Sequence, residues 1–349
     1  MQKREKLNKK IYFIRQKKDA IGGAENYLSR LVEELRKRGF SCEIITSKTP
    51  SFLASWIRAL IFNTEVCLKK RGFYFSLDRI GCPEIYRAGD GVHKVFMKKK
   101  GRKLNPLNIV YLYLEKKAFY NSKLIIANSE KVKREIIESY KIDPKKIKVI
   151  YNGIKIESFN EEESKRKIVN EFALDSGKKI ILFVGSGFER KGVDRFLKIL
   201  SLVKEDFYAF VVGKEKRMKF YVKLAEKFGL KNHIFFTGVR KDVKDFYAAS
   251  DIFLFPPKYE PFSNVVLEAM SYKNAVFTTD DNGACEILDK DFIIHNQNDK
   301  KIALLIERMI ENEKFLNEIK NKNFKIAKNF TIEKNAEESI KAIESVLKA

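Results

Sequence analysis

Short apolar runs alternate with helical patterns along most of the chain. In the first half, strands are predicted at residues 11–14, 43–46, 73–76, 124–127 and 148–151, with helices at about 26–38 and 53–62. A second series of apolar runs follows at residues 179–184, 208–212, 233–237, 251–255 and 275–279. Nearly continuous apolar runs of this length are typical of parallel strands covered by helices on both faces. The pattern therefore predicts an α/β protein with two Rossmann-like, doubly wound sheets.

A turn signal at Tyr151-Asn152-Gly153 and a polar stretch at 160–164 separate the two series. We place an N-terminal domain at 1–163 and a C-terminal domain at 164–332. A final helix at about 333–349 is expected to return to the first domain. Because ligands of such sheets bind outside the carboxyl ends of the strands, we expect a cleft between two facing domains.

The stretch that follows the fourth strand of the second series carries candidate chemistry. Pro261, with Ser263 or Asn264 as cap, is expected to open a helix, and helix N-termini suit phosphate groups. Glu260 lies before this helix and Glu268 within it. One carboxylate accepts two hydrogen bonds, which suits the paired hydroxyls of a ribose or hexose. The alternative is that Glu268 simply faces water.

In each series, the first strand is followed by a loop that contains glycine. Arg190 and Lys191 lie in the second of these loops, where they could hold a diphosphate through charge-assisted hydrogen bonds. Gly22 and Gly23 occupy the corresponding place in the first domain, where backbone N–H groups could face a phosphate. The alternatives are an exposed loop in a lysine-rich protein and an ordinary tight turn.

A third loop, at residues 86–93, contains Asp90 and His93. Together they are candidate contacts for a sugar or for an acceptor hydroxyl. The alternative is a turn-forming aspartate beside a structural histidine.

Composition and charge indicate a globular protein with an anionic partner. The chain has 349 residues, a hydrophobic fraction of 44% and a net charge of +24, so its partner is expected to be a nucleic acid, an acidic membrane or a phosphorylated substrate. No apolar run is long enough to span a bilayer, and a signal-peptide core is not recognised. The four cysteines suggest neither a metal site nor a disulfide framework, which favours a reducing cytosol.

Residues 94–129 contain nine Lys or Arg and a single acid, Glu115. The centre of this basic segment is formed by Lys98, Lys99, Lys100, Arg102 and Lys103, with Phe96, Tyr111, Tyr113, Phe119 and Tyr120 nearby. Docking on an anionic membrane, nonspecific RNA binding and a solvated surface all fit this composition. We favour the membrane, because the chemistry expected in the cleft would give such docking a purpose.

The motif Glu260-Pro-Phe-Ser-Asn-Val-Val-Leu-Glu268 resembles the E-x7-E motif of the family 4 retaining glycosyltransferases, which have the GT-B fold. Supporting matches are Arg190-Lys191-Gly192, Gly22-Gly23-Ala24-Glu25 and Tyr151-Asn152-Gly153. Residues 85–93 and the basic segment are similar, more narrowly, to the lipopolysaccharide core glucosyltransferase I group.

This resemblance implies roles for the candidate residues. Glu268 would bind the nucleotide ribose, and Glu260 would contact hydroxyls of the donor sugar. Asp90 and His93 would lie beside the transferred sugar. The diphosphate and the base would be bound by Gly22, Gly23, Arg190, Lys191, Gly238, Val239, Pro261, Phe262, Ser263 and Asn264.

The implied activity is a retaining, metal-independent transfer of a hexose, with no cofactor. The donor would be a nucleoside-diphosphate sugar, with UDP-glucose or a similar sugar expected. The acceptor would be a glycolipid or lipopolysaccharide core, reached by a cytoplasmic protein peripheral to the inner face of the cytoplasmic membrane. No specific nucleic acid is expected. The alternatives are a GT-B nucleotide-sugar epimerase and a non-catalytic, basic membrane- or RNA-binding protein.

Overall fold

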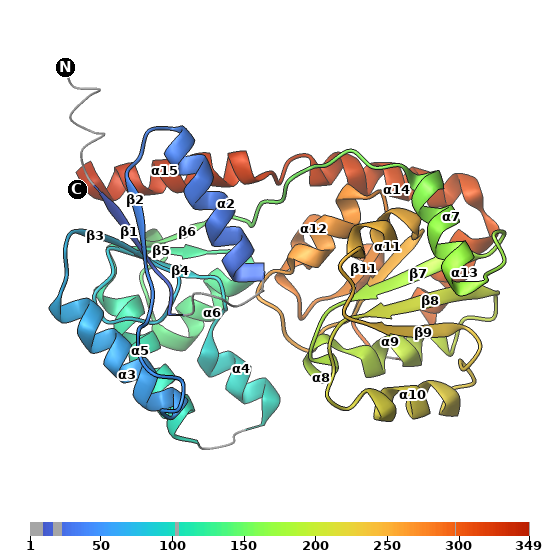
Figure 1. Cartoon of the computed structure of the whole chain (residues 1–349), viewed down its shortest axis with the longest axis horizontal. Helices are drawn as coiled ribbons and strands as arrows, with labels where there is room; N and C mark the ends of the chain where they lie inside the picture. Colours follow the sequence, from blue (N-terminus) through green and yellow to red (C-terminus); the bar gives the residue numbers. More distant parts are fainter. Residues whose placement is uncertain (1–9, 17–22, 102–104, 297, 349) are drawn as a thin grey trace. The chain divides into compact units, whose positions relative to one another are not determined.

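The chain forms two compact units, and each contains one six-stranded parallel sheet (Figure 1). The computed structural model describes residues 10–16, 23–101, 105–296 and 298–348. Unit 1 consists of Met1–Gly153 and Ile332–Ala349, and unit 2 consists of Ile154–Thr331. The predicted α/β class with two parallel sheets is confirmed.

The boundary between the units lies earlier in the chain than the division that we placed at residues 163 and 164. Ile154 pairs with Thr331 in a parallel bridge, and its N–H donates to the carbonyl of Phe330 at 3.0 Å. These bonds attach the polar stretch after Gly153 to unit 2.

Unit 1 has the strand order β2-β1-β3-β4-β5-β6. Its strands are β1 (Ile11–Ile14), β2 (Cys42–Ile45), β3 (Phe73–Ser76), β4 (Ile85–Ala88), β5 (Leu124–Ala127) and β6 (Ile147–Val149). Its helices are α2 (Gly23–Lys37), α3 (Ser55–Leu68), α4 (His93–Lys100), α5 (Pro106–Asn121), α6 (Glu130–Tyr140), the short 3-10 helix η2 (Pro144–Lys146) and α15 (Ile332–Lys348).

The core of unit 1 is built from both ends of the chain. Leu31 of α2 and Ile343 of α15 are fully buried in the cluster that also contains Phe13 and Phe75 of the sheet. A second cluster, around Phe119 of α5, includes residues from α6 and from β4 to β6. Burial of such large side chains contributes about 1.5–3 kcal/mol each. The last helix is therefore an integral part of unit 1.

Strand β4 was not predicted from the sequence, because Arg87 interrupts a short apolar run. The structure buries this arginine by placing its guanidinium 4.0 Å from the ring centroid of Tyr27. The guanidinium also donates a hydrogen bond to the side chain of Asn152. An aromatic face and an amide oxygen thus replace water around the charge. A strand with a buried arginine at its centre does not appear as an apolar run in the sequence.

Unit 2 has the strand order β12-β11-β10-β7-β8-β9. Its strands are β7 (Lys179–Val184), β8 (Phe207–Val212), β9 (Ile234–Gly238), β10 (Ile252–Phe255), β11 (Ala275–Thr279) and β12 (Ile293–Ile294). Its helices are α7 (Glu161–Phe172), α8 (Phe188–Lys191), α9 (Val193–Leu200), α10 (Met218–Lys227), α11 (Val243–Ala249), α12 (Asn264–Ser271), η3 (Gly283–Ile287), η4 (Lys290–Phe292), α13 (Lys300–Glu311) and α14 (Glu313–Ala327).

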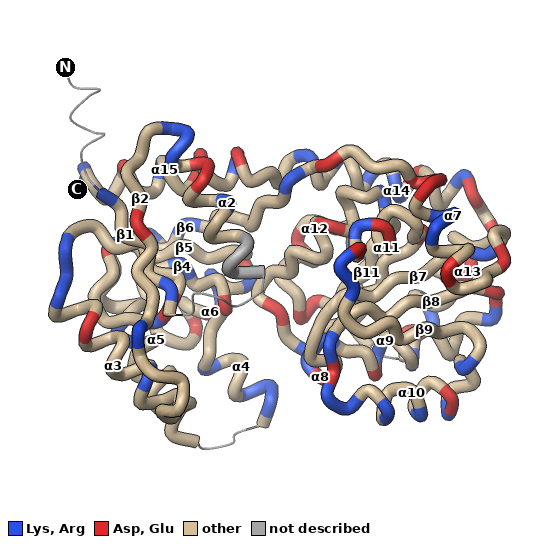
Figure 2. The backbone as a smooth tube through the Cα atoms, viewed as in Figure 1, with Lys and Arg blue, Asp and Glu red and all other residues tan. Residues whose placement is uncertain are grey.

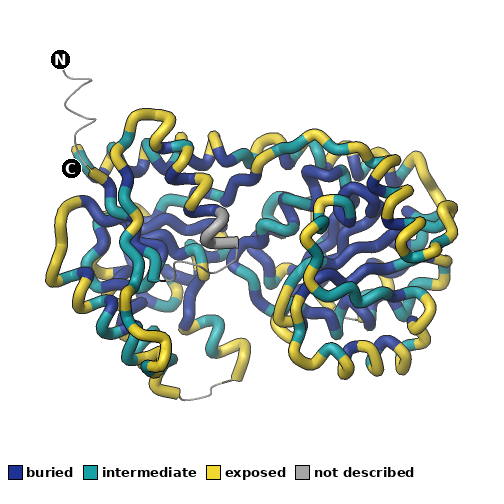
Figure 3. Tube along the Cα trace, viewed as in Figure 1, coloured by how far each residue is buried: buried dark blue, intermediate teal, exposed yellow. Residues whose placement is uncertain are grey.

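The central strands β7, β8 and β10 of unit 2 are largely buried on both faces, as Figure 3 shows for β7 and β8. At their carboxyl ends, backbone packing requires a glycine between α8 and α9. Gly192 has φ +82°, and a Cβ atom there would lie 1.9 Å from the carbonyl oxygen of Pro256. This contact brings α8 against the end of β10.

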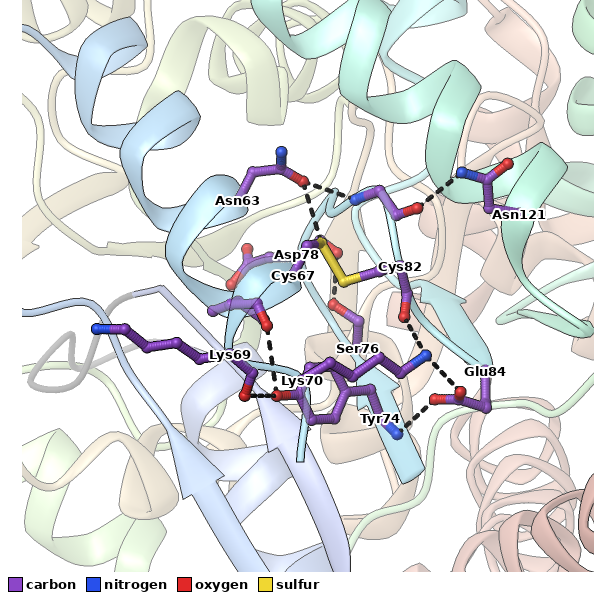
Figure 4. The surroundings of a disulfide bond; sticks show 12 residues. Asn63, Cys67, Lys69, Lys70, Tyr74, Ser76, Asp78, Cys82, Glu84 and Asn121 are labelled. Atoms are coloured by element: carbon purple, nitrogen blue, oxygen red, sulfur yellow. Dashed lines mark hydrogen bonds and ion pairs between the residues drawn. A yellow bond between two sulfur atoms is a disulfide. The ribbon is translucent and has the colours of Figure 1, made fainter. Parts of the chain in front are cut away.

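A disulfide joins Cys67 of α3 to Cys82 in the loop between β3 and β4, with Cα atoms 5.7 Å apart (Figure 4). The expectation of no disulfide is therefore wrong. The pairing arises because this loop folds back on α3, which residue spacing does not reveal. Three hydrogen bonds to Gly81 and Cys82 hold the same loop: Asn63 accepts from the Gly81 N–H at 2.7 Å, Asn121 donates to the Gly81 carbonyl at 2.7 Å, and Lys70 donates to the Cys82 carbonyl at 3.0 Å.

Removing the disulfide is expected to destabilise unit 1. Cys67→Ala/Cys82→Ala opens a loop of 15 residues, and closing such a loop contributes about 3 kcal/mol through the entropy of the unfolded chain. Urea unfolding of oxidised protein measures the loss. An unchanged free energy of unfolding would show that the two thiols are not linked in solution.

Gly192→Ala is expected to destabilise unit 2 much more than Gly187→Ala. Both glycines have left-handed φ, of +82° and +78°, which costs an alanine about 1 kcal/mol. Gly187 has open space around its Cβ position, whereas Gly192 adds a clash with backbone, for a total of about 3 kcal/mol. Equal losses in urea unfolding would contradict the close approach of α8 to β10.

Candidate active site

Two cations converge on one carboxylate at the carboxyl ends of β7 and β10. Arg190 Nη1 lies 2.5 Å and Lys191 Nζ lies 2.7 Å from the same oxygen, Oε2 of Glu260. Both cations belong to α8, and Glu260 lies in the loop between β10 and α12. Three candidates identified separately in the sequence therefore form one cluster in unit 2.

Backbone hydrogen bonds hold this cluster in place. The Glu260 N–H donates to the Asp281 carbonyl and the Glu260 carbonyl accepts from the Gly283 N–H, both at 3.0 Å. The Lys258 N–H donates to the Arg190 carbonyl at 2.9 Å. The loop after β10 is thus bonded both to α8 and to the turn after β11.

The cluster is charged and largely shielded from water. Side-chain exposure is 13% for Glu260, 14% for Lys191 and 44% for Arg190. Burial alone would raise the pKa of Glu260, but Lys191 and Arg190 outweigh it and hold that pKa below its usual value. Burial lowers the pKa of Lys191, although Glu260 opposes the shift. Two cations against one carboxylate leave an excess of positive charge that suits an anionic ligand.

Glu268 lies half-buried on α12 and accepts a hydrogen bond from the Tyr247 hydroxyl at 3.2 Å. The Tyr247 ring stacks on Tyr272, with centroids 5.7 Å apart. Burial, with Glu268 adding to it, raises the pKa of Tyr247 well above its usual value, so this hydroxyl stays a donor. Tyr247 was not predicted, because a tyrosine in the helix before β10 carries no sequence signal for contact with Glu268.

The segment before α12 is buried and irregular. Pro261, Phe262 and Ser263 are buried, and Asn264 is half-buried. Ser263 is the N-cap of α12, but its side chain forms no capping hydrogen bond. The first N–H groups of such a helix are suited to an anion.

The remaining residues predicted to bind the nucleotide sugar are less well defined in the structure. Gly238 ends β9 with φ +70°, and its carbonyl accepts from the Gly213 N–H at 2.8 Å. Val239 is 71% exposed, so its side chain is accessible to a ligand. Gly23 begins α2 in unit 1, whereas Gly22 lies outside the described residues.

In unit 1, Asp90 and His93 are tied to one arginine-centred network. Asp90 Oδ2 lies 3.9 Å from Arg79 Nη1. His93 is buried at the first position of α4, rather than in a loop, and its Nε2 lies 3.1 Å from Asn108 Oδ1. Burial and then Arg79 lower the pKa of His93, so the imidazole is neutral at pH 7. Arg79 and Glu115, which bonds to it, were not predicted as site residues.

The basic segment is divided by the structure. Lys98, Lys99 and Lys100 are exposed in the last turn of α4 (Figures 2 and 3). Arg102 and Lys103 lie outside the described residues. In the described part of the chain, every helix is too short or too polar to span a bilayer.

The aromatic residues near this segment are also divided. Tyr113 and Tyr120 of α5 are exposed, together with Ile109. Phe119 is fully buried, and Tyr111 packs edge-on against His93 with centroids 5.3 Å apart. The surface that could meet a partner is therefore smaller than the sequence suggested.

Two family models match the chain. The model described as "Glycosyltransferase Family 4" matches residues 86–158, and "Glycosyl transferases group 1" matches residues 163–326. The chain is 40% identical over 104 residues to the lipopolysaccharide glucosyltransferase WaaG of Escherichia coli, covering 29% of this chain and 28% of that protein.

A second relative comes from Campylobacter jejuni. The chain is 25% identical over 238 residues to its N-acetylgalactosamine-N,N'-diacetylbacillosaminyl-diphospho-undecaprenol 4-alpha-N-acetylgalactosaminyltransferase, covering 67% of this chain and 63% of that protein. These matches span less than two thirds of the relatives' own lengths.

Solved structures share the fold along nearly the whole chain. The crystal structure of WaaG has a TM-score of 0.78 at 19% identity and covers 94% of this chain and 98% of its own. Anabaena HepE, solved in complex with UDP and glucose, has a TM-score of 0.75 at 19% identity and covers 97% and 100%. With both family models matched and the fold shared, this chain belongs to the family 4 glycosyltransferases of the GT-B type.

Proposed function

We propose that this protein is a retaining, metal-independent hexosyltransferase that uses a UDP-sugar, UDP-glucose or a similar donor. The observation that carries the proposal is the pairing of Arg190 and Lys191 with one oxygen of Glu260. A nucleoside diphosphate supplies the negative charge that this cluster lacks. The complex of HepE with UDP and glucose supports the choice of donor.

Donor binding exchanges one set of ion pairs for another. Phosphate oxygens accept hydrogen bonds from Arg190 and Lys191 in place of Glu260 Oε2. Glu260 is then released to accept hydrogen bonds from hydroxyls of the donor sugar, while Glu268 accepts from the ribose. The same cluster thus binds the diphosphate leaving group and contacts the sugar that is transferred.

The cations also lower the barrier to reaction. Cleavage of the anomeric bond places negative charge on the leaving diphosphate as the sugar becomes cation-like. Donors that are already fixed by α8 stabilise this charge as it develops. A phosphate oxygen can take the proton of the acceptor hydroxyl, so the reaction needs no strong protein base.

Asp90 and His93 are proposed to contact the transferred sugar or the acceptor hydroxyl. When Nε2 of the neutral His93 donates to Asn108 Oδ1, Nδ1 is left as a hydrogen-bond acceptor. An exposed Asp90 carboxylate likewise suits a hydroxyl or a cation-like sugar.

The acceptor is proposed to be a glycolipid or a lipopolysaccharide core presented at a membrane. The name of WaaG supports this acceptor class. The exposed Lys98, Lys99 and Lys100 attract anionic lipid, and the exposed Ile109 and Tyr113 of α5 can enter its interfacial region. They support our proposal that the protein acts at the inner face of the cytoplasmic membrane.

Lys191→Ala is expected to lower turnover of UDP-glucose roughly 10²–10³-fold, the usual scale for losing one transition-state donor. Release of UDP measures both hydrolysis and transfer. Lys223→Ala, which removes an exposed lysine of α10, is the matched control and should retain wild-type turnover. Full activity of Lys191→Ala would refute the role of this lysine. Separately, an epimerised UDP-sugar formed by the wild-type protein without an acceptor would favour the epimerase alternative.

Replacing Lys98, Lys99 and Lys100 by alanine is expected to weaken binding to anionic vesicles about 100-fold, at about 1 kcal/mol per lysine. Co-sedimentation at increasing ionic strength measures the change, because screening removes the attraction of exposed charges. The control replaces three exposed lysines of α10, Lys219, Lys223 and Lys227. Equal losses in both triple variants would contradict a docking surface on α4.

A further inference from the structure

We propose that Glu115 is a positioning residue that holds both Asp90 and His93 in place for sugar transfer. The proposal rests on the proposed roles of these two residues. Glu115 lies on α5 and is 0% exposed, whereas an ordinary helix glutamate faces solvent. A buried charge of this kind needs a full set of partners.

Glu115 provides the N-terminal cap that α4 lacks in its own sequence. The N-cap residue Val92 has no capping side chain, and the first turn of α4 contains no acid. Instead, Glu115 Oε1 accepts from the His93 N–H at 2.7 Å, and Oε2 lies 3.3 Å from the Lys94 N–H. A carboxylate at a helix N-terminus also interacts favourably with the helix dipole. The backbone of His93 is therefore fixed by a neighbouring helix.

The same carboxylate fixes Asp90 through Arg79. Arg79 Nε donates to Glu115 Oε1 at 3.1 Å, and the guanidinium then reaches the Gly91 carbonyl at 3.4 Å and Asp90 at 3.9 Å. The loop between β4 and α4 is thus held on one side by Arg79 and on the other by the start of α4.

Only an acceptor-only group fits this position. Four donors point at Glu115: the N–H groups of His93 and Lys94, the Arg79 guanidinium and the Tyr140 hydroxyl, whose oxygen lies 2.7 Å from Oε2. A glutamine of the same shape would turn its NH₂ group toward two of these groups; the Tyr140 hydroxyl can also accept a hydrogen bond, but the guanidinium and the backbone N–H groups cannot. The charge of Glu115, and not only its volume, is therefore required.

Glu115→Gln is compared with Glu84→Gln to separate positioning from stability. Glu84 is a half-buried carboxylate of unit 1, bonded to Lys70 at 2.5 Å and to the Tyr74 N–H at 2.7 Å, but its bonds lead to the disulfide loop rather than to α4 (Figure 4). Both variants should lower the urea midpoint.

Only Glu115→Gln should lower kcat for UDP-glucose turnover, by roughly tenfold or more, with little change in KM, because the donor binds unit 2. Equal kcat in the two variants would overturn the proposal.

An NMR titration of the His93 ring gives a readout that does not depend on activity. The charged groups that affect this imidazole are Arg79, which lowers its pKa, and Glu115, which raises it. The pKa of His93 should therefore fall in Glu115→Gln and stay unchanged in Glu84→Gln, with His93→Gln used to assign the signal. An unchanged His93 titration in Glu115→Gln would overturn the proposal.

Two further outcomes are distinguishable. If wild-type protein turns over no UDP-sugar, the proposed function fails, and the His93 titration still decides whether Glu115 controls that ring. If Glu115→Gln does not fold, Tyr140→Phe removes a single donor to Glu115 and should lower kcat roughly fivefold at unchanged KM. Wild-type kcat in Tyr140→Phe would then contradict the positioning role.

Discussion

The shared oxygen of Glu260 is the interaction on which the chemistry of unit 2 depends. Two cations of α8 lie within 2.7 Å of it, and the cluster carries more positive than negative charge. Such an arrangement is costly to bury unless a further anion joins it. The close approach of Gly192 to Pro256 places α8 at this point. Backbone packing therefore determines where a diphosphate is best accommodated.

Unit 1 also contains a buried charged cluster, but this one is centred on a carboxylate. There a single carboxylate, Glu115, accepts hydrogen bonds from Arg79, from Tyr140 and from the backbone N–H groups of His93 and Lys94. Its helix, α5, also exposes Ile109 and Tyr113 to solvent. The helix that carries Glu115 is thus the same helix that we propose to meet the membrane.

Much of the fold could be predicted from the sequence, because buried parallel strands leave continuous apolar runs. The strands at 11–14, 73–76 and 179–184 have the same bounds in the structure. Strand β4 was missed because Arg87 is buried by an aromatic ring and an amide, which compensate its charge locally. The disulfide was missed because it depends on how one loop folds back on α3.

The candidate site also contains residues that could be predicted from the sequence and one that could not. Arg190, Lys191 and Glu260 could be predicted to share a ligand, because each follows a strand whose carboxyl end lies at one edge of the sheet. Glu115 could not, since its distance in sequence from His93 follows no helical or strand period. Arg190, Lys191 and Glu260 thus belong to recognisable sequence motifs, whereas Glu115 is identified only from its contacts with Arg79 and His93.

Calorimetric titration with UDP and with uridine tests the central claim most directly. If Arg190 and Lys191 bind the diphosphate, UDP should bind at least about 100-fold more tightly than uridine, since each charge-assisted hydrogen bond contributes about 1.5–3 kcal/mol. This advantage should largely disappear in Arg190→Ala/Lys191→Ala. Equal affinities for UDP and uridine in the wild-type protein would contradict diphosphate binding at the Glu260 cluster.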